Sequence, residues 1–245
     1  KVEQLNQRFL AVTKNIEKAK AFGVPSENIF PLWEWVGGRY SVWSCAALPI
    51  ILKFGESIFE KFLIGGNCVD KHLREASINK NIPKWLALLN FWNDNFLGAE
   101  SLAIVPYDER LSLFPAYIQQ LEMESNGKSV DNEGAKLIHK SAPVVFGGNG
   151  TSAQHNFFQA IHQGNKLVPV DFIVTLSDGG QNEILKRFQI ANCFAQSSVM
   201  MKGDSKNKAH YRLAGNRPSN TIILNKLDPS SLGALISLYE HKTII

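Results

Sequence analysis

A regular alternation of short apolar runs and longer amphipathic segments, beginning near residue 100, is the feature that most constrains the fold of this chain. The apolar, strand-like runs cover residues 101–105, 143–146, 167–176 and 221–224. A segment with a helical pattern follows each of them, at residues 109–125, 152–163, 179–201 and 229–239. Strands that alternate with helices form a mainly parallel sheet covered by helices. The sequence therefore predicts an α/β sandwich.

The residues before this alternation follow a less regular pattern. An apolar, β-branched run at residues 9–13 predicts a strand, and residues 15–22 predict an amphipathic helix after it. A second helix is expected at residues 41–52, where Pro49 should end or kink it. A third is expected at residues 57–75, interrupted at Gly65-Gly66.

A short polar stretch at residues 77–83 is the best candidate for a domain boundary. It separates about eighty residues, which hold two candidate strands, from the regular alternation. The first part is too small to complete a doubly wound sheet alone. We therefore predict one part at residues 1–79 and a fuller α/β unit at residues 80–245.

Composition excludes several classes of protein. Apolar residues make up 44% of the chain, which is enough for a sizeable core. The net charge of +4 is spread along the sequence, so a nucleic-acid-binding protein is not expected. Three isolated cysteines without a CxxC spacing argue against a disulfide framework or a zinc site. The most apolar uncharged run, residues 40–52, is too short to span a bilayer, so we expect a cytoplasmic protein with no membrane partner.

A glycine-rich turn, Gly147-Gly148-Asn149-Gly150-Thr151, joins a predicted strand to a predicted helix. Backbone N–H groups at such a turn can meet a ligand. The turn lacks the lysine of a P-loop and the spacing of a dinucleotide site, so a plain structural turn is the alternative. Residues 141–165 contain no Lys, Arg, Asp or Glu, yet they are rich in Asn, Gln and His. Neutral polar groups at that density suit a site that recognises hydroxyls.

His155 and His162 lie seven residues apart, which would place them on one helix face about 10 Å apart along the axis. Two histidines that bind one metal ion from a helix favour a spacing of four residues, so a metal site is not expected. A lone helical histidine is also commonly a structural residue. The sequence leaves both interpretations of these histidines open.

Glu124 is expected in the last turn of a helix that Gly127 closes. A carboxylate there faces the negative pole of the helix dipole, which disfavours its charged form slightly and suits a general base. Gln120, four residues earlier, should project from the same face. A solvated helix end is the alternative for Glu124.

Arg39 follows Gly37-Gly38. Two glycines let a substrate approach the backbone closely, and a guanidinium beyond them can hold an oxyanion or a phosphate. An ordinary surface arginine after a turn is the alternative.

The ten residues from Trp35 to Ser44 closely resemble the first fingerprint of the glucose-6-phosphate isomerase (phosphoglucose isomerase) family. Blocks that resemble the same family follow in order, at residues 89–92, 106–108, 119–120, 123–128, 150–151 with 154–155, 162–164, 216–219, 232–235 and 239–242. The resemblance extends from about Phe9 to Lys242.

This resemblance implies an enzyme of glycolysis and gluconeogenesis that interconverts glucose 6-phosphate and fructose 6-phosphate without cofactor or metal. Glu124 would be the base that moves a proton between C2 and C1 through a cis-enediol intermediate. Arg39 would offset the charge on that intermediate, and Gln120 and Gly38 would line the substrate pocket. His155 would assist opening of the cyclic sugar and, as in the family, reach into the neighbouring active site of a homodimer.

The resemblance also implies which domain of the family each of the two predicted parts corresponds to. Residues 1–79 look like the C-terminal part of a first sugar-isomerase domain, and residues 80–245 like a second one without its C-terminal end. The family's phosphate-binding segments would lie upstream of Lys1 and its catalytic lysine beyond Ile245. We therefore expect the 245 residues alone to be inactive.

Departures from the family pattern are modest. Leu121-Glu122 stands where Gly-Asp or Leu-Asp is commoner, and none of the implied catalytic groups is replaced. Two alternatives stay open at this point. One is a sugar-phosphate sensor that kept the fold and lost catalysis, and the other is a fusion of the isomerase to a transaldolase.

Overall fold

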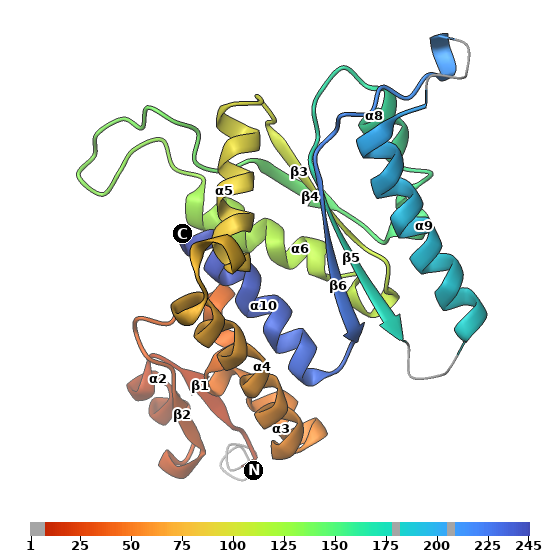
Figure 1. Cartoon of the computed structure of the whole chain (residues 1–245). Helices are drawn as coiled ribbons and strands as arrows, with labels where there is room; N and C mark the ends of the chain where they lie inside the picture. Colours follow the sequence, from red (N-terminus) through yellow and green to blue (C-terminus); the bar gives the residue numbers. More distant parts are fainter. Residues whose placement is uncertain (1–7, 178–181, 205–208) are drawn as a thin grey trace. The chain divides into compact units, whose positions relative to one another are not determined.

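The structure, a computed structural model, describes residues 8–177, 182–204 and 209–245. The chain divides into two compact units, Lys1–Ile64 and Gly65–Ile245 (Figure 1). The division falls earlier in the sequence than the polar stretch at residues 77–83. The assignment of residues 1–79 and 80–245 to two sugar-isomerase domains stays a prediction.

The first unit holds a small parallel sheet. Strand β1 (Ala11–Thr13) pairs with β2 (Ile29–Pro31), and helix α2 (Ile16–Ala21) lies between them in sequence. The side chain of Asn15 caps α2 by accepting a hydrogen bond from the Lys18 N–H. The short 3₁₀ turn η1 (Ser26–Asn28) leads into β2.

The predicted helix at residues 41–52 is wrong in its extent. The segment forms two 3₁₀ turns, η2 (Gly38–Trp43) and η3 (Cys45–Ala47), before helix α3 (Leu48–Phe54). Ser44 separates the turns because its backbone is extended and its side chain caps the Ala46 N–H. Pro49 lies in the first turn of α3, where its missing N–H costs nothing, so it starts a helix instead of ending one.

Helix α4 (Glu56–Glu75) is continuous, so the interruption predicted at Gly65-Gly66 is wrong. Gly65 has a packing role there. A Cβ atom at Gly65 would lie 1.8 Å from the carbonyl oxygen of Ser230, at the start of helix α10 (Pro229–Ile244). The glycine is needed for close approach of two helices and does not break its own helix.

Helix α5 (Ile82–Asn95) follows the 3₁₀ turn η4 (Ile78–Lys80). Asn81 caps α5 and is completely buried. Its side-chain amide also donates to the Leu73 carbonyl over 2.9 Å, which joins the end of α4 to the start of α5.

A four-stranded parallel sheet forms the centre of the second unit, as the sequence predicts. Its order is β4 (Val144–Gly147), β3 (Ser101–Pro106), β5 (Val170–Ser177) and β6 (Ser219–Lys226). The two central strands, β3 and β5, are buried along most of their length. Their nearly unbroken apolar runs are typical of strands covered on both faces.

Helices cover both faces of this sheet (Figure 1). Helices α7 (Gly150–Ala153), α8 (Phe158–Gln163) and α9 (Glu183–Lys202) lie on one side, and α5, α6 (Phe114–Ile118) and α10 on the other. The 3₁₀ turns η5 (Glu109–Leu111) and η7 (Ala209–Tyr211) lie in the connections. The predicted helix at 179–201 is α9, although residues 179–181 lie outside the described part of the chain.

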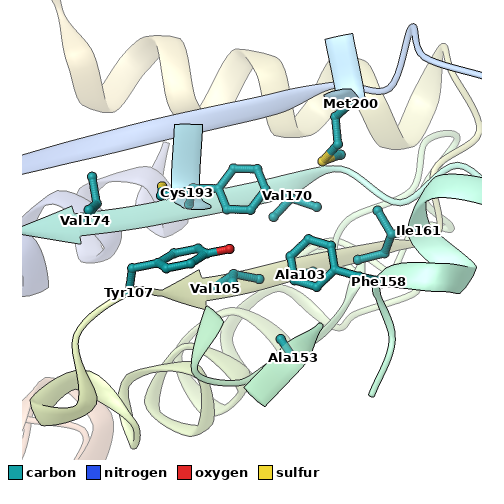
Figure 2. Close-up of a cluster of buried hydrophobic side chains, with 11 residues drawn as sticks. Ala103, Val105, Tyr107, Ala153, Phe158, Ile161, Val170, Val174, Cys193 and Met200 are labelled. Carbon is teal, nitrogen blue, oxygen red and sulfur yellow. The ribbon is translucent and has the colours of Figure 1, made fainter. Parts of the chain in front are cut away.

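The core on the α9 side contains alternate residues of β3 and β5 (Figure 2). Side chains two residues apart in a strand share one face, so Ala103 and Val105 lie on the same side as Phe172 and Val174. Phe158 of α8 stacks on Phe172 at 6.2 Å between ring centroids. The intervening strand residues face the opposite side of the sheet, where α6 and α10 lie.

Candidate active site

The helix expected at residues 109–125 is built from three different pieces. The turn η5 and helix α6 are followed by a π-helical segment, η6 (Gln119–Glu124), which holds Gln120 and Glu124. A π-helix is wider than an α-helix, is rarely favoured by its own residues and is frequent at functional sites. The change of helix type therefore coincides with the predicted base.

Gln120 and Glu124 lie side by side at the end of this segment. The amide nitrogen Nε2 of Gln120 donates a hydrogen bond to Oε2 of Glu124 over 3.0 Å. Both side chains are exposed to solvent, so either can meet a ligand. The sequence-based expectation that they share a face is consistent with this geometry.

Glu122, two residues before the predicted base, points into the protein. Its side chain is 2% exposed and accepts a hydrogen bond from Nζ of Lys242 in α10 over 2.9 Å. The hydroxyl of Thr243 and the amide of Asn90 also donate to it, over 3.2 and 3.3 Å. Successive acidic residues of the π turn thus face opposite environments, one buried and paired, the other exposed.

Gly127 ends the segment in a way that the sequence did not predict. A helix-capping glycine usually adopts a left-handed conformation, and Gly127 is absent from the residues that do so in the described chain. Its N–H donates to the Met123 carbonyl over 3.0 Å. A Cβ atom would lie 2.3 Å from that same oxygen, so a tight backbone approach requires glycine here.

The glycine-rich turn after β4 packs closely on the core. Asn149 accepts a hydrogen bond from the Thr151 N–H and donates to Oε2 of Glu109 over 2.8 Å. A Cβ atom at Gly150 would lie 2.4 Å from the ring of Tyr107. The turn therefore has a structural reason for its glycine, whatever else it binds.

His155 and His162 do not lie on one continuous helix, so the predicted helix at 152–163 is wrong in its middle. Residues 154–157 form a turn between α7 and α8. Phe157 causes the break, since its backbone leaves the helical region at φ −134°. His155 is exposed on this turn. Its neighbour Gln154 is hydrogen-bonded to Asn192 of α9, which ties the turn to a long helix.

His162 has a structural environment. Its Nε2 atom lies 2.6 Å from Oε1 of Gln196 in α9, and its ring stacks on Phe158. These contacts favour the structural interpretation of His162 and leave His155 as the exposed histidine of the pair.

Arg39 and Gly38 belong to the first unit. They begin the 3₁₀ turn η2, and the Arg39 guanidinium lies 5.5 Å from the ring centroid of Tyr40. The space beside the Cα atom of Gly38 is open, with no atom within 4 Å of a built Cβ. An open backbone next to a half-buried arginine is suited to a ligand.

A buried ionic cluster at the carboxyl ends of β3 and β5 was missed by sequence reasoning. Asp108 accepts hydrogen bonds from Arg110 at 2.7 Å and from Thr175 at 2.8 Å, and Lys186 of α9 binds Thr175. Burial alone would raise the pKa of the Asp108 carboxyl group. The hydrogen bonds from Arg110 and Thr175 outweigh this effect and lower the pKa to about 2. Asp108 and Arg110 lie two residues apart, but no local pattern joins them to Thr175 of β5 and Lys186 of α9.

The described residues hold neither a metal-binding cluster nor a membrane-spanning helix. Nowhere in the described ranges do three or more His, Cys, Asp or Glu side chains gather in a way that could hold a metal ion. Among the helices of those ranges, none combines the length and the apolar character needed to cross a membrane.

Known proteins are similar to this chain in sequence and in fold. The family model described as "Phosphoglucose isomerase" matches residues 1–245. The glucose-6-phosphate isomerase of Chlorobium phaeobacteroides is 44% identical over 262 aligned positions, covering 99% of this chain and 47% of that protein. The enzyme of Saccharophagus degradans is 43% identical, with 98% and 47% covered. The chain thus spans about half the length of these relatives.

Solved structures agree. The crystal structure of a glucose-6-phosphate isomerase from Chlamydia trachomatis has a TM-score of 0.83 and 36% identity, over 88% of this chain and 43% of that one. A hypothetical protein from Thermus thermophilus matches at a TM-score of 0.74 and 21% identity, over 98% of this chain and 57% of that one, which shows the fold alone. The α/β fold and the family resemblance predicted from the sequence are confirmed, and the chain belongs to the phosphoglucose isomerase family.

Proposed function

We propose that the whole protein carrying this sequence interconverts D-glucose 6-phosphate and D-fructose 6-phosphate. The observation that carries the proposal is the exposed Glu124 carboxylate, held by Gln120 at 3.0 Å on an anchored π-helical turn. Family membership and the names of the relatives support the same substrate class, a sugar phosphate.

Proton transfer by one carboxylate accounts for the reaction. In the open-chain aldose, the C1 carbonyl acidifies the proton on C2, and Glu124 removes that proton. The electron pair of that C–H bond forms a C1–C2 double bond, the carbonyl π pair moves onto the C1 oxygen, and this oxygen takes a proton from water, which the C2 hydroxyl later returns, to give a cis-enediol. Glu124 then returns its proton to C1 while the C2 hydroxyl loses its proton and becomes the carbonyl of the ketose. Atoms and electrons balance within the substrate, so the proposal includes no cofactor and no metal.

Arg39 offsets the negative charge that develops on the oxygens of this intermediate. A fixed guanidinium is effective because it needs no reorganisation when the charge appears. Gly38 gives the substrate room beside the backbone, and Gln120 orients Glu124 while lining the pocket.

His155 serves ring opening, which must precede proton removal from C2. Its imidazole moves a proton between the ring oxygen and the anomeric hydroxyl. We propose further that the protein is a homodimer in which His155 acts in the neighbouring active site. The exposure of His155 on the turn after α7 supports this part of the proposal. The activity is assigned to the cytoplasm, in glycolysis and gluconeogenesis.

A coupled assay of the whole protein tests the proposal. Glu124→Gln keeps the side-chain shape and removes the base, so turnover should fall by several orders of magnitude while substrate binding persists. Glu133→Gln, at an exposed carboxylate of the following loop, is the matched control and should keep full turnover. An unaltered protein that binds fructose 6-phosphate without converting it would overturn the proposal in favour of a sensor.

A further inference from the structure

The buried ion pair between Glu122 and Lys242 lies directly behind the turn that carries Glu124. Both side chains are 2% exposed, and Nζ of Lys242 donates to Oε2 of Glu122 over 2.9 Å. Thr243 and Asn90 complete the hydrogen bonding of the Glu122 carboxylate. The pair also lines a cavity of about 560 Å³ that reaches the last residues of α10.

A second anchor lies on the other side of Glu124. The amide of Asn126 donates to the backbone carbonyl of Thr243 over 2.8 Å. Residues two before and two after Glu124 are therefore both fastened to the last turn of α10. Contacts to one helix, α10, therefore hold the chain on both sides of Glu124.

The strand β4 holds the same segment from a different direction. The sulfur of Met123 accepts a hydrogen bond from the Val145 N–H, and the amide of Gln119 donates to the Val145 carbonyl over 3.1 Å. Of the six residues in the π turn, Leu121 and Glu122 are buried, and the exposed pair Gln120 and Glu124 is joined by a hydrogen bond.

Stability alone is a poor explanation for such a pair. Burying two charges costs several kcal/mol in desolvation, and well-packed apolar residues often replace such pairs without loss of stability. A π turn, however, has little intrinsic preference for its own geometry. Contacts from outside must select it over an α-helix, in which Glu124 would point elsewhere.

We propose that Glu122 and Lys242 are positioning residues, which select the π-helical turn and so hold the Glu124 carboxylate in its reactive place. This inference rests on the proposed function, because it takes Glu124 as the base. It adds that the orientation of the base is determined by the last turn of α10, where Lys242 lies 118 positions after Glu124 in the sequence. Misplacement of a reacting group by about 1 Å can cost about 100-fold in rate.

Three variants of the whole protein separate positioning from simple structural support. Glu122→Gln and Lys242→Met each remove one charge, and the double variant removes both without leaving a charge unpaired. Each should lower kcat per folded molecule by about 10- to 100-fold and change KM by less than about 3-fold. The losses should not add in the double variant, since the two residues act as one unit. Glu122→Asp, which keeps the charge, should recover most of the kcat lost in Glu122→Gln.

The matched control is Lys186→Met. Lys186 is also a buried lysine, 5% exposed, and lies 3.7 Å from the buried carboxylate of Asp108. It should lose stability to a similar degree with kcat per folded molecule unchanged. If the buried-charge variants do not fold, Asn126→Ala decides, because it removes the second anchor without exposing a buried charge. A 3- to 10-fold fall in its kcat, roughly, is the expected result.

The outcomes distinguish this inference from the proposed function. If the unaltered protein has no isomerase activity, the proposed function fails. A second outcome is that the unaltered protein is active, Glu124→Gln is inactive, and the pair variants lose stability but keep full kcat. In that case the positioning role is wrong and the assignment of Glu124 as the base stands. Lower kcat with an unchanged KM and non-additive losses would support the positioning role.

Discussion

The hydroxyl of Tyr239 in α10 donates a hydrogen bond to the carboxylate of Asp171 in β5 over 3.0 Å, and both side chains are fully buried. Asn220 of β6 donates to the other oxygen of the same carboxylate over 2.7 Å. Burial raises the pKa of Asp171. The contact therefore fastens α10 to the centre of the sheet. The last turn of the same helix holds the π-helical segment.

Tyr239→Phe tests this contact. The change removes one donor and leaves a buried acceptor with fewer partners, so the free energy of unfolding should fall by about 1–3 kcal/mol. Urea unfolding of the two proteins at the same pH measures it. An unchanged midpoint would mean that the hydrogen bond contributes nothing net. Tyr211→Phe, at an exposed tyrosine, is the control and should have no effect.

Asp108 should make stability fall in acid. Its pKa in the folded state is about 2, below the ordinary value of about 3.9 in an unfolded chain. As the pH falls from about 5 towards 2, the unfolded state takes up a proton that the folded state does not, so the stability contribution of Asp108 is lost in that window. Urea midpoints between pH 2 and 6 measure the slope. Asp108→Asn should be less stable near neutral pH and show a shallower slope, and an unchanged slope would contradict this account.

Gly127→Ala should destabilise the segment after Glu124. The added methyl group would lie 2.3 Å from the Met123 carbonyl oxygen, a backbone atom that cannot move away alone. We expect a loss of about 1–3 kcal/mol, in the range of overpacked sites, and a lower kcat because the neighbouring turn must shift. Gly38→Ala is the stability control, since the space beside Gly38 is open. Equal unfolding midpoints for the two variants would contradict the predicted clash.

His155→Ala separates ring opening from proton transfer. If His155 opens the cyclic sugar, turnover of the natural substrate should fall by about 10²- to 10⁴-fold, the usual contribution of a general acid or base. An open-chain analogue should be affected far less. Comparing kcat for both substrates gives the answer, with His139→Ala as an exposed control. Equal losses on both substrates would argue against the ring-opening role.

Local patterns were sufficient to predict the strands and most of the helices of the second unit. The apolar runs of β3 and β5 have no competing interpretation, and Asp228 and Pro229 mark the start of α10 clearly. The same patterns failed where a distant contact decides. Gly65 looks like a helix breaker until Ser230 is placed against it, and no periodicity encodes the turn at residues 154–157 that separates α7 from α8.

In the candidate site, too, local spacing predicted some features, and distant contacts decided the others. The four-residue spacing of Gln120 and Glu124 was enough to predict that they are neighbours. The π turn was not predictable, because its selection depends on Lys242, a residue 120 positions after Glu122. A lysine in the last turn of a helix is ordinarily a solvated charge that complements the helix dipole. Its burial becomes visible only when the carboxylate of Glu122 is found beside it.

The π-helical turn has a consequence for how the family's chain length can vary. Geometrically, such a turn is an α-helix with one residue inserted. Deleting one residue, such as Leu121, would restore α-helical spacing and rotate everything before it by about 100° relative to Glu124. Gln120 and Glu124 would then lie three residues apart, a spacing that still places them on one helix face, but Glu124 would point in a different direction relative to α6, although every catalytic side chain would still be present. Insertions and deletions should therefore be excluded from Gln119–Glu124 more strictly than substitutions, because the number of residues in the turn determines the direction in which the Glu124 side chain points.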